Sequence, residues 1–469
     1  MIFSSVTFLF YFLPLFLILY FISPFKNTVL LVASLLFYAW GEAQYTLLLL
    51  VSIFFNYLFG LLIDRYRNEI KSKNIMLSFG ISINLSLIVY YKYFNFLAEA
   101  IFHYKADIPV HLPLGISFFT FQAISYLVDV YRNEAKVEKN PFNLALYISM
   151  FPQLIAGPIV RFKTVAEQIV SRDHTVDNFY AGMKIFLIGL AQKALIANTV
   201  AITADQVFSL PQSALTTGAA WIGTVCYSLQ IYFDFAGYSN MAIGLGLIMG
   251  FTFPVNFNYP YISQSITEFW RRWHISLSTW FRDYLYIPLG GNRVSPVRTY
   301  FNLMLVFLLC GLWHGAATTF LIWGAYHGLF LMLERYKLSE FLNKLWRPIR
   351  HFYTLLVVMI GWVIFRANDL TQLNYFLKTL LGFNGIQQAV TTPITLNHST
   401  TTSLIIGLMF SLPIMVAIKN KFAILKSNNQ KIQLLSSQLL LDIFIFSCFF
   451  LSLINIASGS YNPFIYFRF

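Results

Sequence analysis

The stretch FNLMLVFLLCGLWHGAATTFLIWGAYHGLFLML, residues 301–333, contains no Asp, Glu, Lys or Arg in 33 positions. A run of this length and composition predicts helix in a membrane, where the backbone must satisfy its own hydrogen bonds. An ionisable side chain at membrane depth is costly and usually faces a cavity. His314 stands in this run, in the motif Gly311-Leu312-Trp313-His314-Gly315. It is therefore the first candidate for a catalytic group, since a neutral imidazole is well suited to accept a proton.

Basic residues flank the run on both sides, with Arg293 and Arg298 before it and Arg335 after it. Short loops rich in Lys and Arg mark the cytoplasmic side of a membrane, so both ends are expected there. Thirty-three helical residues reach only about 50 Å, too short for two crossings of about 30 Å each and a turn. The sequence thus predicts a hairpin that enters the membrane and returns, with His314 near its tip.

The whole chain has the composition of a membrane protein. Of its 469 residues 58% are hydrophobic and 11% are charged, whereas soluble domains carry about 25% charged residues. Apolar runs recur along the whole length, which predicts an all-α polytopic membrane protein. We expect spans near residues 2–23, 27–41, 43–62, 75–101, 112–131, 142–160, 180–204, 217–250, 301–333, 351–366, 402–418 and 438–458.

Charge and cysteine usage exclude other classes. The net charge of +13 comes from basic residues in short loops, without any nucleic-acid-binding motif, so no nucleic-acid partner is expected. The three cysteines lie far apart and no His-Glu-x-x-His spacing occurs, so no metal is expected.

Orientation follows from three basic loops near residues 65–73, 335–350 and 419–431, which we assign to the cytoplasm. We expect one membrane domain over residues 1–469, with both termini extracytoplasmic and a tail at 459–469. Residues 252–334 form the expected catalytic core. Its first part, rich in Pro, Gly, Arg and aromatic residues, predicts amphipathic and re-entrant elements.

A second Trp-His pair lies in FWRRWHISLSTWFRD, residues 269–283. Arginines beside aromatic rings can bind a phosphorylated ligand through bidentate contacts and stacking. Helices at the membrane surface are also rich in Trp and Arg, so a purely interfacial helix is the slightly favoured interpretation of this segment taken alone. The candidates for donor binding are Arg271, Arg272, Trp273 and Arg282, and His274 is a second candidate catalytic residue.

Three further residues are candidates to line or support a tunnel. Asp234 is a carboxylate inside an apolar run and could orient a histidine or form a structural ion pair. Trp313 precedes His314. His327 could support the same cavity or be a buried structural histidine.

Four segments together resemble the membrane-bound O-acyltransferase family, in particular its bacterial alginate and peptidoglycan O-acetyltransferase branch. The segments are FPQLIAGP (151–158), Gln230 to Asn240, Phe269 to Gly291, and Gly311 to Gly315. The resemblance implies a ring of about 11 tilted helices plus re-entrant helices around a central tunnel. In that family the histidine of the Trp-His-Gly motif is catalytic, which corresponds to His314, and His274 corresponds to a second polar site residue.

The last residues resemble another part of such systems. Phe464-Ile465-Tyr466-Phe467 is similar to the end of the small partner peptide in teichoic acid D-alanylation, where the tyrosine is thought to carry the acyl group. The resemblance implies Tyr466 as a relay nucleophile. Without it, the aromatic tail would be an interfacial belt.

Together these features predict transfer of an acetyl group from cytoplasmic acetyl-CoA across a bacterial inner membrane to a polysaccharide, with peptidoglycan preferred to alginate or cellulose. A periplasmic serine-esterase-like O-acetyltransferase is the expected partner. Two alternatives remain open at this stage. One is a transporter or flippase with proton-relay histidines, and the other is an acyltransferase acting on lipid or protein.

Overall fold

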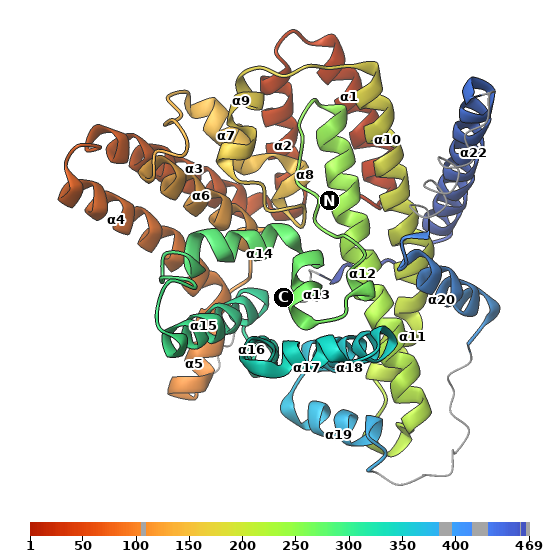
Figure 1. Ribbon diagram of the computed structural model, residues 1–469. Coiled ribbons are helices and arrows are strands. Elements are labelled where there is room, and N and C mark those ends of the chain that lie inside the picture. Colours follow the sequence, from red (N-terminus) through yellow and green to blue (C-terminus); the bar gives the residue numbers. More distant parts are fainter. Residues whose placement is uncertain (105–108, 384–395, 415–429, 460, 466–469) are drawn as a thin grey trace. The chain divides into compact units, whose positions relative to one another are not determined.

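The computed structural model describes residues 1–104, 109–383, 396–414, 430–459 and 461–465. Every regular element in these ranges is a helix, as predicted (Figure 1). Six helical stretches of the described chain are long and apolar enough to cross a membrane, and Phe8–Ile22 and Ile116–Tyr131 are shorter apolar helices. The six are Lys26–Arg65, Ile70–Ile101, Val176–Phe208, Pro296–His314, Arg347–Arg366 and Gln438–Ala457.

The chain separates into two compact units. The first contains residues 1–186, 241–255 and 279–285, and the second contains residues 187–240, 256–278 and 286–469. Four helical elements of the described chain contribute residues to both units: α10 (Val176–Ala191), α12 (Thr217–Ile248), α14 (Ile275–Phe281) and η7 (Arg282–Tyr286).

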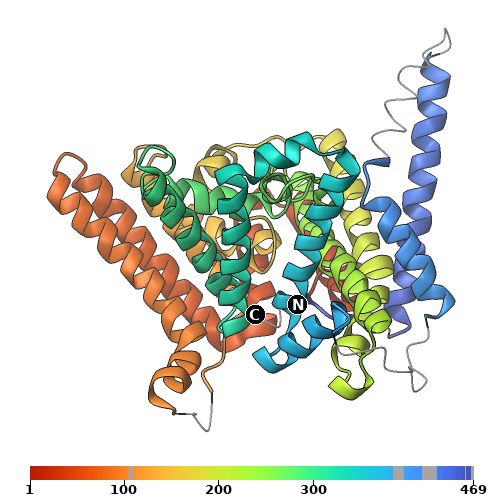
Figure 2. The ribbon, with the colours of Figure 1, turned by 60° about the horizontal axis from the view of Figure 1, so that its bottom comes forward.

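In the first unit, helices α3 and α4 form a long pair joined by a short turn (Figure 2). Asn56 and Asn84 exchange amide hydrogen bonds between them at 2.7 and 3.2 Å, so each buried amide satisfies the other. The elements of this unit are η1 (Phe8–Phe12), α1 (Leu13–Ile22), α2 (Lys26–Glu42), η2 (Ala43–Tyr45), α3 (Thr46–Arg65), α4 (Ile70–Ile88), η3 (Val89–Tyr93), α5 (Phe94–Phe102), α6 (Ile116–Tyr131), α7 (Pro141–Ser149), α8 (Phe151–Leu154) and α9 (Phe162–Val170).

The expected span at 142–160 is wrong as a single helix. Helix α7 ends at Ser149 because Met150 leaves helical geometry, with φ −53° and ψ 113°. Only the four-residue α8 follows, and residues 155–161 are irregular although most are buried. Such backbone needs local partners, and Ser34 supplies one, since its Oγ accepts a hydrogen bond from Phe151 N at 3.1 Å.

The second unit contains the elements that carry both Trp-His pairs. Helix α13 packs against α16 and α18, and α15 packs along α16. Its elements, besides its parts of α10, α12, α14 and η7 (Arg282–Tyr286), are η4 (Gln192–Ala197), α11 (Asn198–Phe208), η5 (Gln212–Ala214), η6 (Pro260–Ile262), α13 (Ile266–Arg272), α15 (Pro296–His314), α16 (Thr318–Leu333), η8 (Glu334–Leu338), α17 (Ser339–Lys344), α18 (Arg347–Arg366), α19 (Leu370–Leu380), α20 (His398–Phe410) and α22 (Gln430–Ala457).

Helices α15 and α16 form the predicted hairpin. Gly311 lies against the backbone of Phe320, and four residues earlier Phe307 lies against Gly324, which is antiparallel register. His314 is the last residue of α15, so it stands at the tip as expected. The first arm begins at Pro296, five residues before the apolar run. Helix α15 has 19 residues and is long enough to cross a membrane by itself. The chain therefore need not turn back partway through the membrane, as the length of the apolar run had suggested.

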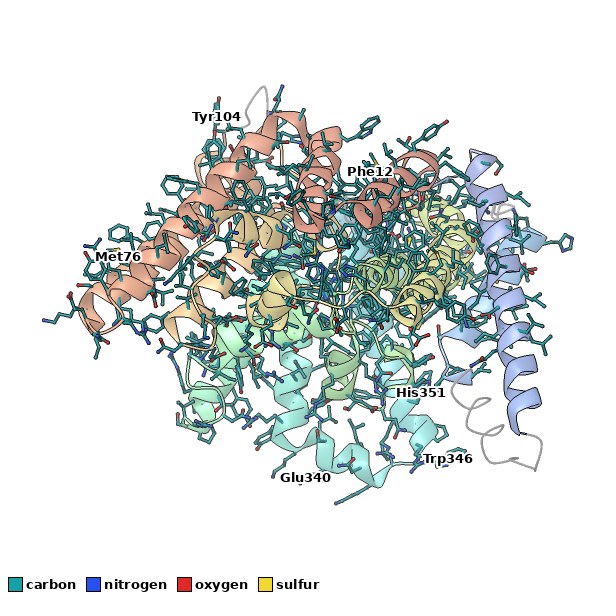
Figure 3. The ribbon with its side chains drawn as sticks, turned by 90° about the horizontal axis from the view of Figure 1, so that it is seen from above. Phe12, Met76, Tyr104, Glu340, Trp346 and His351 are labelled. Atoms are coloured by element: carbon teal, nitrogen blue, oxygen red, sulfur yellow. The ribbon has the colours of Figure 1, made fainter. Side chains whose placement is uncertain are left out.

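The expected basic loop at 335–350 is largely helical, because η8 and α17 continue directly from α16. Figure 3 shows Glu340, Trp346 and His351 around the connection from α17 to α18. Helices α20 and α22 both pack against η4, and α20 also packs against α11. Most of the third basic loop, 419–431, lies outside the described residues.

Candidate functional site

His314 is enclosed by aromatic rings of the second unit. Its ring centre lies 4.9 Å from that of Trp313, 5.2 Å from that of Trp323 and 5.1 Å from that of Phe365. Only 7% of the residue is exposed. The hairpin positions this residue, because α15 and α16 are in close contact at Gly311, one turn before His314 ends α15. The imidazole therefore sits in a largely water-excluded setting, where proton transfer is strongly influenced by its neighbours.

A small cavity opens beside His314. All of its lining residues belong to the second unit, and His314 is the one among them with an ordinarily titratable side chain. The other walls are large and apolar or aromatic, so the space beside the imidazole suits a small reacting group. The lining consists of Ile231, Phe235, Trp273, His314, Trp323, Trp362, Phe365 and Ile465.

His274 is fully buried and has a left-handed backbone, with φ 42°. It links α13 to α14, and its ring packs edge-on against Phe235 with centres 4.5 Å apart. A positive φ is uncommon for a residue with a side chain and costs free energy, so it persists where the surroundings impose it. This backbone signal, which the sequence does not reveal, makes His274 a stronger functional candidate.

The partners of His274 identify its tautomer. Asn256 Oδ1 accepts hydrogen bonds from Ser276 N at 3.1 Å and from Ser276 Oγ at 2.9 Å. A backbone N–H can only donate, so this amide atom is the oxygen. His274 Nδ1 lies 3.2 Å from the same oxygen and must therefore donate. The neutral ring then carries its lone pair on Nε2.

Burial favours the same neutral form. It lowers the pKa of His274 well below its usual value, and a positive charge on His314 would lower it further. The ring is therefore neutral at ordinary pH, and its Nε2 can accept a proton or a hydrogen bond but cannot donate one.

Trp313 lies between the two histidines, with ring centres 6.0 Å from His274 and 4.9 Å from His314. The structure thus brings three predicted site residues together. His327 is also fully buried, but it packs against Trp270 and Trp323, with its ring centre 5.1 Å from each, and it is not among the residues that line the cavity.

The four predicted donor-binding residues have different surroundings. Arg271 is exposed, whereas Arg272 pairs with Glu268 at 2.9 Å. Trp273 is buried in the cavity wall. Arg282 belongs to the first unit and pairs with its neighbour Asp283 at 2.7 Å. Arg271 and Arg282 are both exposed, and the charge of Arg282 is shared with Asp283.

Asp234 forms a buried ion pair with Lys193 of η4, with Lys193 Nζ 2.7 Å from Asp234 Oδ1. Sequence reasoning anticipated a partner for Asp234 but missed Lys193. The available signal was a cation inside the apolar run 180–204, opposite in sign to the carboxylate in the run 217–250. No group of three His, Cys, Asp or Glu side chains suited to a metal occurs in the described part of the chain.

The C-terminal tail reaches the cavity. Ile465 lines it and is 4% exposed, as is Phe464. Ile465 N donates a hydrogen bond to Asp234 Oδ2 at 2.9 Å. Tyr466, the predicted relay residue, is the next residue along the chain and lies outside the described residues.

Comparison with known proteins gives consistent matches. Residues 34–377 match the membrane-bound O-acyltransferase family. A probable alginate O-acetylase of Azotobacter vinelandii is 49% identical over 380 residues, covering 79% of this chain and 76% of that protein. A peptidoglycan O-acetyltransferase of Helicobacter pylori is 39% identical over 430 residues, covering 82% and 81%. A teichoic acid D-alanyltransferase of Bacillus subtilis is 34% identical over 266 residues, covering 53% and 65%.

Proposed function

The chain belongs to the membrane-bound O-acyltransferase family and is a multi-pass membrane O-acyltransferase, and from this premise we propose that it transfers an acetyl group from cytoplasmic acetyl-CoA to an extracytoplasmic polysaccharide. Membership of an acyltransferase family removes the support for the transporter alternative. The alternative of a lipid or protein acceptor is less well supported, since the similar proteins named above carry the names of polysaccharide-modifying enzymes.

The observation that carries the proposal is the buried imidazole of His314 beside a small apolar cavity, one wall of which is formed by Ile465 of the C-terminal tail. In the proposed reaction, His314 takes the proton of an acceptor hydroxyl as the oxygen attacks the thioester carbonyl. The tetrahedral intermediate then expels the CoA thiolate, which receives the proton from His314. An ester and free CoA-SH result, so the proton count is balanced.

His274 would assist through its Nε2 lone pair. Because its Nδ1 donates to Asn256, the ring can accept a hydrogen bond from the acceptor hydroxyl or from His314. It cannot hold an acyl carbonyl in the same tautomer, since that would require a donor. Proton transfer is therefore the role that we propose for it.

The acceptor hydroxyl that we propose is that of Tyr466. Its support is the Phe-Ile-Tyr-Phe sequence at 464–467 and the place of Ile465 in the wall of the His314 cavity. The resulting tyrosyl ester would be passed to a serine hydroxyl of a periplasmic O-acetyltransferase and then to the glycan. This route requires an inner-membrane protein with an extracytoplasmic C-terminus.

We propose a polysaccharide as the final acceptor without naming a particular one. The relatives named for alginate reach 49% identity and the one named for peptidoglycan 39%, so the preference for peptidoglycan has no support from similarity. The aromatic walls of the cavity favour a short acyl chain. Arg271 is the proposed contact for donor phosphates, because it is exposed, whereas Arg272 pairs with Glu268 and Arg282 pairs with Asp283.

His314→Gln tests the proposal directly. Gln keeps a polar side chain of similar length but cannot act as a base, so acyl transfer from acetyl-CoA should fall about 10²–10⁴-fold. Release of CoA by the purified protein is the measurement. His398→Gln, at an exposed site on α20, is the matched control and should keep full activity. Normal turnover by folded His314→Gln would contradict the assignment.

A further inference from the structure

The described end of the chain, residues 461–465, is held by side chains of the second unit. Its contacts come from η4, α11 and α12, elements more than 200 residues earlier. Phe464 also packs its ring against Tyr238, with centres 4.9 Å apart. A short terminal segment is usually poorly ordered unless specific contacts fix it. The contacts of this tail are therefore the feature to explain.

The innermost contacts come from the Lys193–Asp234 ion pair. Asp234 Oδ2 accepts the hydrogen bond from Ile465 N, while Lys193 Nζ donates to Pro463 O. The two side chains are 2% and 1% exposed. Lys193 and Asp234 thus each bind the other side chain and also one backbone group of the tail. The pair recognises main chain, so it fixes the register of the tail irrespective of the side chains.

Helix packing alone does not explain this pair. Burying two charges costs several kcal/mol each, and an apolar pair of similar size usually packs as well or better. An apolar pair could not bind the N–H of Ile465 and the carbonyl of Pro463. Lys193 also lies in η4, a π-helical segment, and such insertions occur frequently at functional sites.

A second set of contacts lies nearer the start of the tail. Asn198 Nδ2 donates to Asn462 Oδ1 at 3.1 Å. Tyr461 donates its hydroxyl to Asp205 Oδ2 at 2.6 Å, and the other oxygen of Asp205 pairs with Arg366 at 2.6 Å. Tyr461 is 46% exposed, so these contacts are weaker than the buried pair. The contacts of Asn198 and Asp205 hold residues 461 and 462, whereas Lys193 and Asp234 hold residues 463 and 465, which lie nearer the cavity.

We propose that Lys193 and Asp234 are positioning residues that lock residues 463–465 into the cavity wall and so set how far the C-terminus enters the site of His314. This proposal rests on the proposed function, because a fixed position of residues 463–465 would place the hydroxyl of Tyr466 for acyl transfer. Seating of the tail is nevertheless a separate property from chemistry. It can be measured without any substrate.

The reporter is a thiol introduced by Ile465→Cys in a Cys448→Ser background. Cys448 is the partly exposed native cysteine, whereas Cys226 and Cys310 are buried. Lys193 and Asp234 bind backbone atoms of the tail, so the Ile465→Cys substitution preserves these hydrogen bonds. A membrane-permeable maleimide should label this thiol slowly in the parent chain.

The test variant is the double change Lys193→Met/Asp234→Asn. Either single change leaves a buried unpaired charge and could prevent folding, whereas the double change leaves none. Two charge-assisted hydrogen bonds to the tail are weakened or lost, so labelling should accelerate about tenfold or more. Glu134→Gln, which removes one ion pair of the first unit and leaves Lys163 beside the buried Asp129, is the control and should leave the rate unchanged.

Activity separates the two ideas, measured in chains that keep Ile465. Faster labelling with loss of acyl transfer and an unchanged KM for acetyl-CoA supports both. Faster labelling with normal transfer supports the lock and contradicts the tail as acceptor. Unchanged labelling in a folded double variant overturns the lock, whatever the activity.

Discussion

At the scale of single residues, His274 carries the least expected information. Its backbone has a left-handed φ, and its donation to Asn256 specifies one tautomer, which leaves the lone pair on Nε2, the ring nitrogen that does not face Asn256. Strain, burial and a fixed tautomer at one residue are features that cluster at functional sites, and they support the role proposed for His274.

Burial of neutral His274 makes stability depend on pH. Its pKa is lowered in the folded state by burial and by His314, so the unfolded chain binds this proton first. Its contribution to stability is complete above the unfolded value of about 6.5 and is lost as pH falls toward the folded pKa, by up to about 1.4 kcal/mol per pH unit.

His274→Asn should reduce this acid sensitivity. Asn tolerates positive φ, and its amide can replace Nδ1 as donor to Asn256. We expect the drop in melting temperature between pH 7 and pH 5.5 to be smaller in the variant. An equal drop in both proteins would show that His274 is not buried in its neutral form.

The sequence predicts the two histidines but not their partners. A histidine in an uncharged run is visible because ionisable residues are rare there. Lys193 escaped notice because its significance depends on a carboxylate 41 residues later and a tail 270 residues later. Side-chain pairings of this kind arise from tertiary contacts that no local pattern encodes.

At the scale of elements, the α15–α16 hairpin positions His314. A Cβ at Gly311 would overlap the carbonyl oxygen of Phe320, and one at Gly324 would overlap that of Phe307. Small residues let membrane helices approach this closely. The charge pattern and length of the run predicted the hairpin. The break at Met150 was not predicted, although Pro152, Gly157 and Pro158 lie in the run 142–160, because the irregular backbone that follows is supported by distant groups such as Ser34.

Gly311→Ala should separate the two arms and displace His314. Overpacking of this kind costs about 1–3 kcal/mol of stability, and a displacement of about 1 Å at a reacting group can cost about 10²-fold in rate. Thermal unfolding and acyl transfer are the measurements. Gly218→Ala, where a Cβ on α12 would meet nothing within 4 Å, is the control and should be neutral or slightly stabilising. Full activity of Gly311→Ala would argue against tight positioning by the hairpin.

At the scale of the whole molecule, the sequence predicted the all-helical membrane class from composition and the family from motifs. The division into two compact units was not predicted, because residues 241–255 and 279–285 join the first unit from within the C-terminal half. His314 of the hairpin and the tail that we propose as its acceptor segment belong to the same unit, although they lie about 150 residues apart in the sequence.

Mass analysis of the C-terminal peptide after incubation of the purified protein with acetyl-CoA tests the central claim most directly. The account predicts an added acetyl group on Tyr466 in the native chain and none in His314→Gln. Release of CoA by the native chain together with acetylation of a glycan or partner protein, but with Tyr466 unmodified throughout the time course, would contradict it.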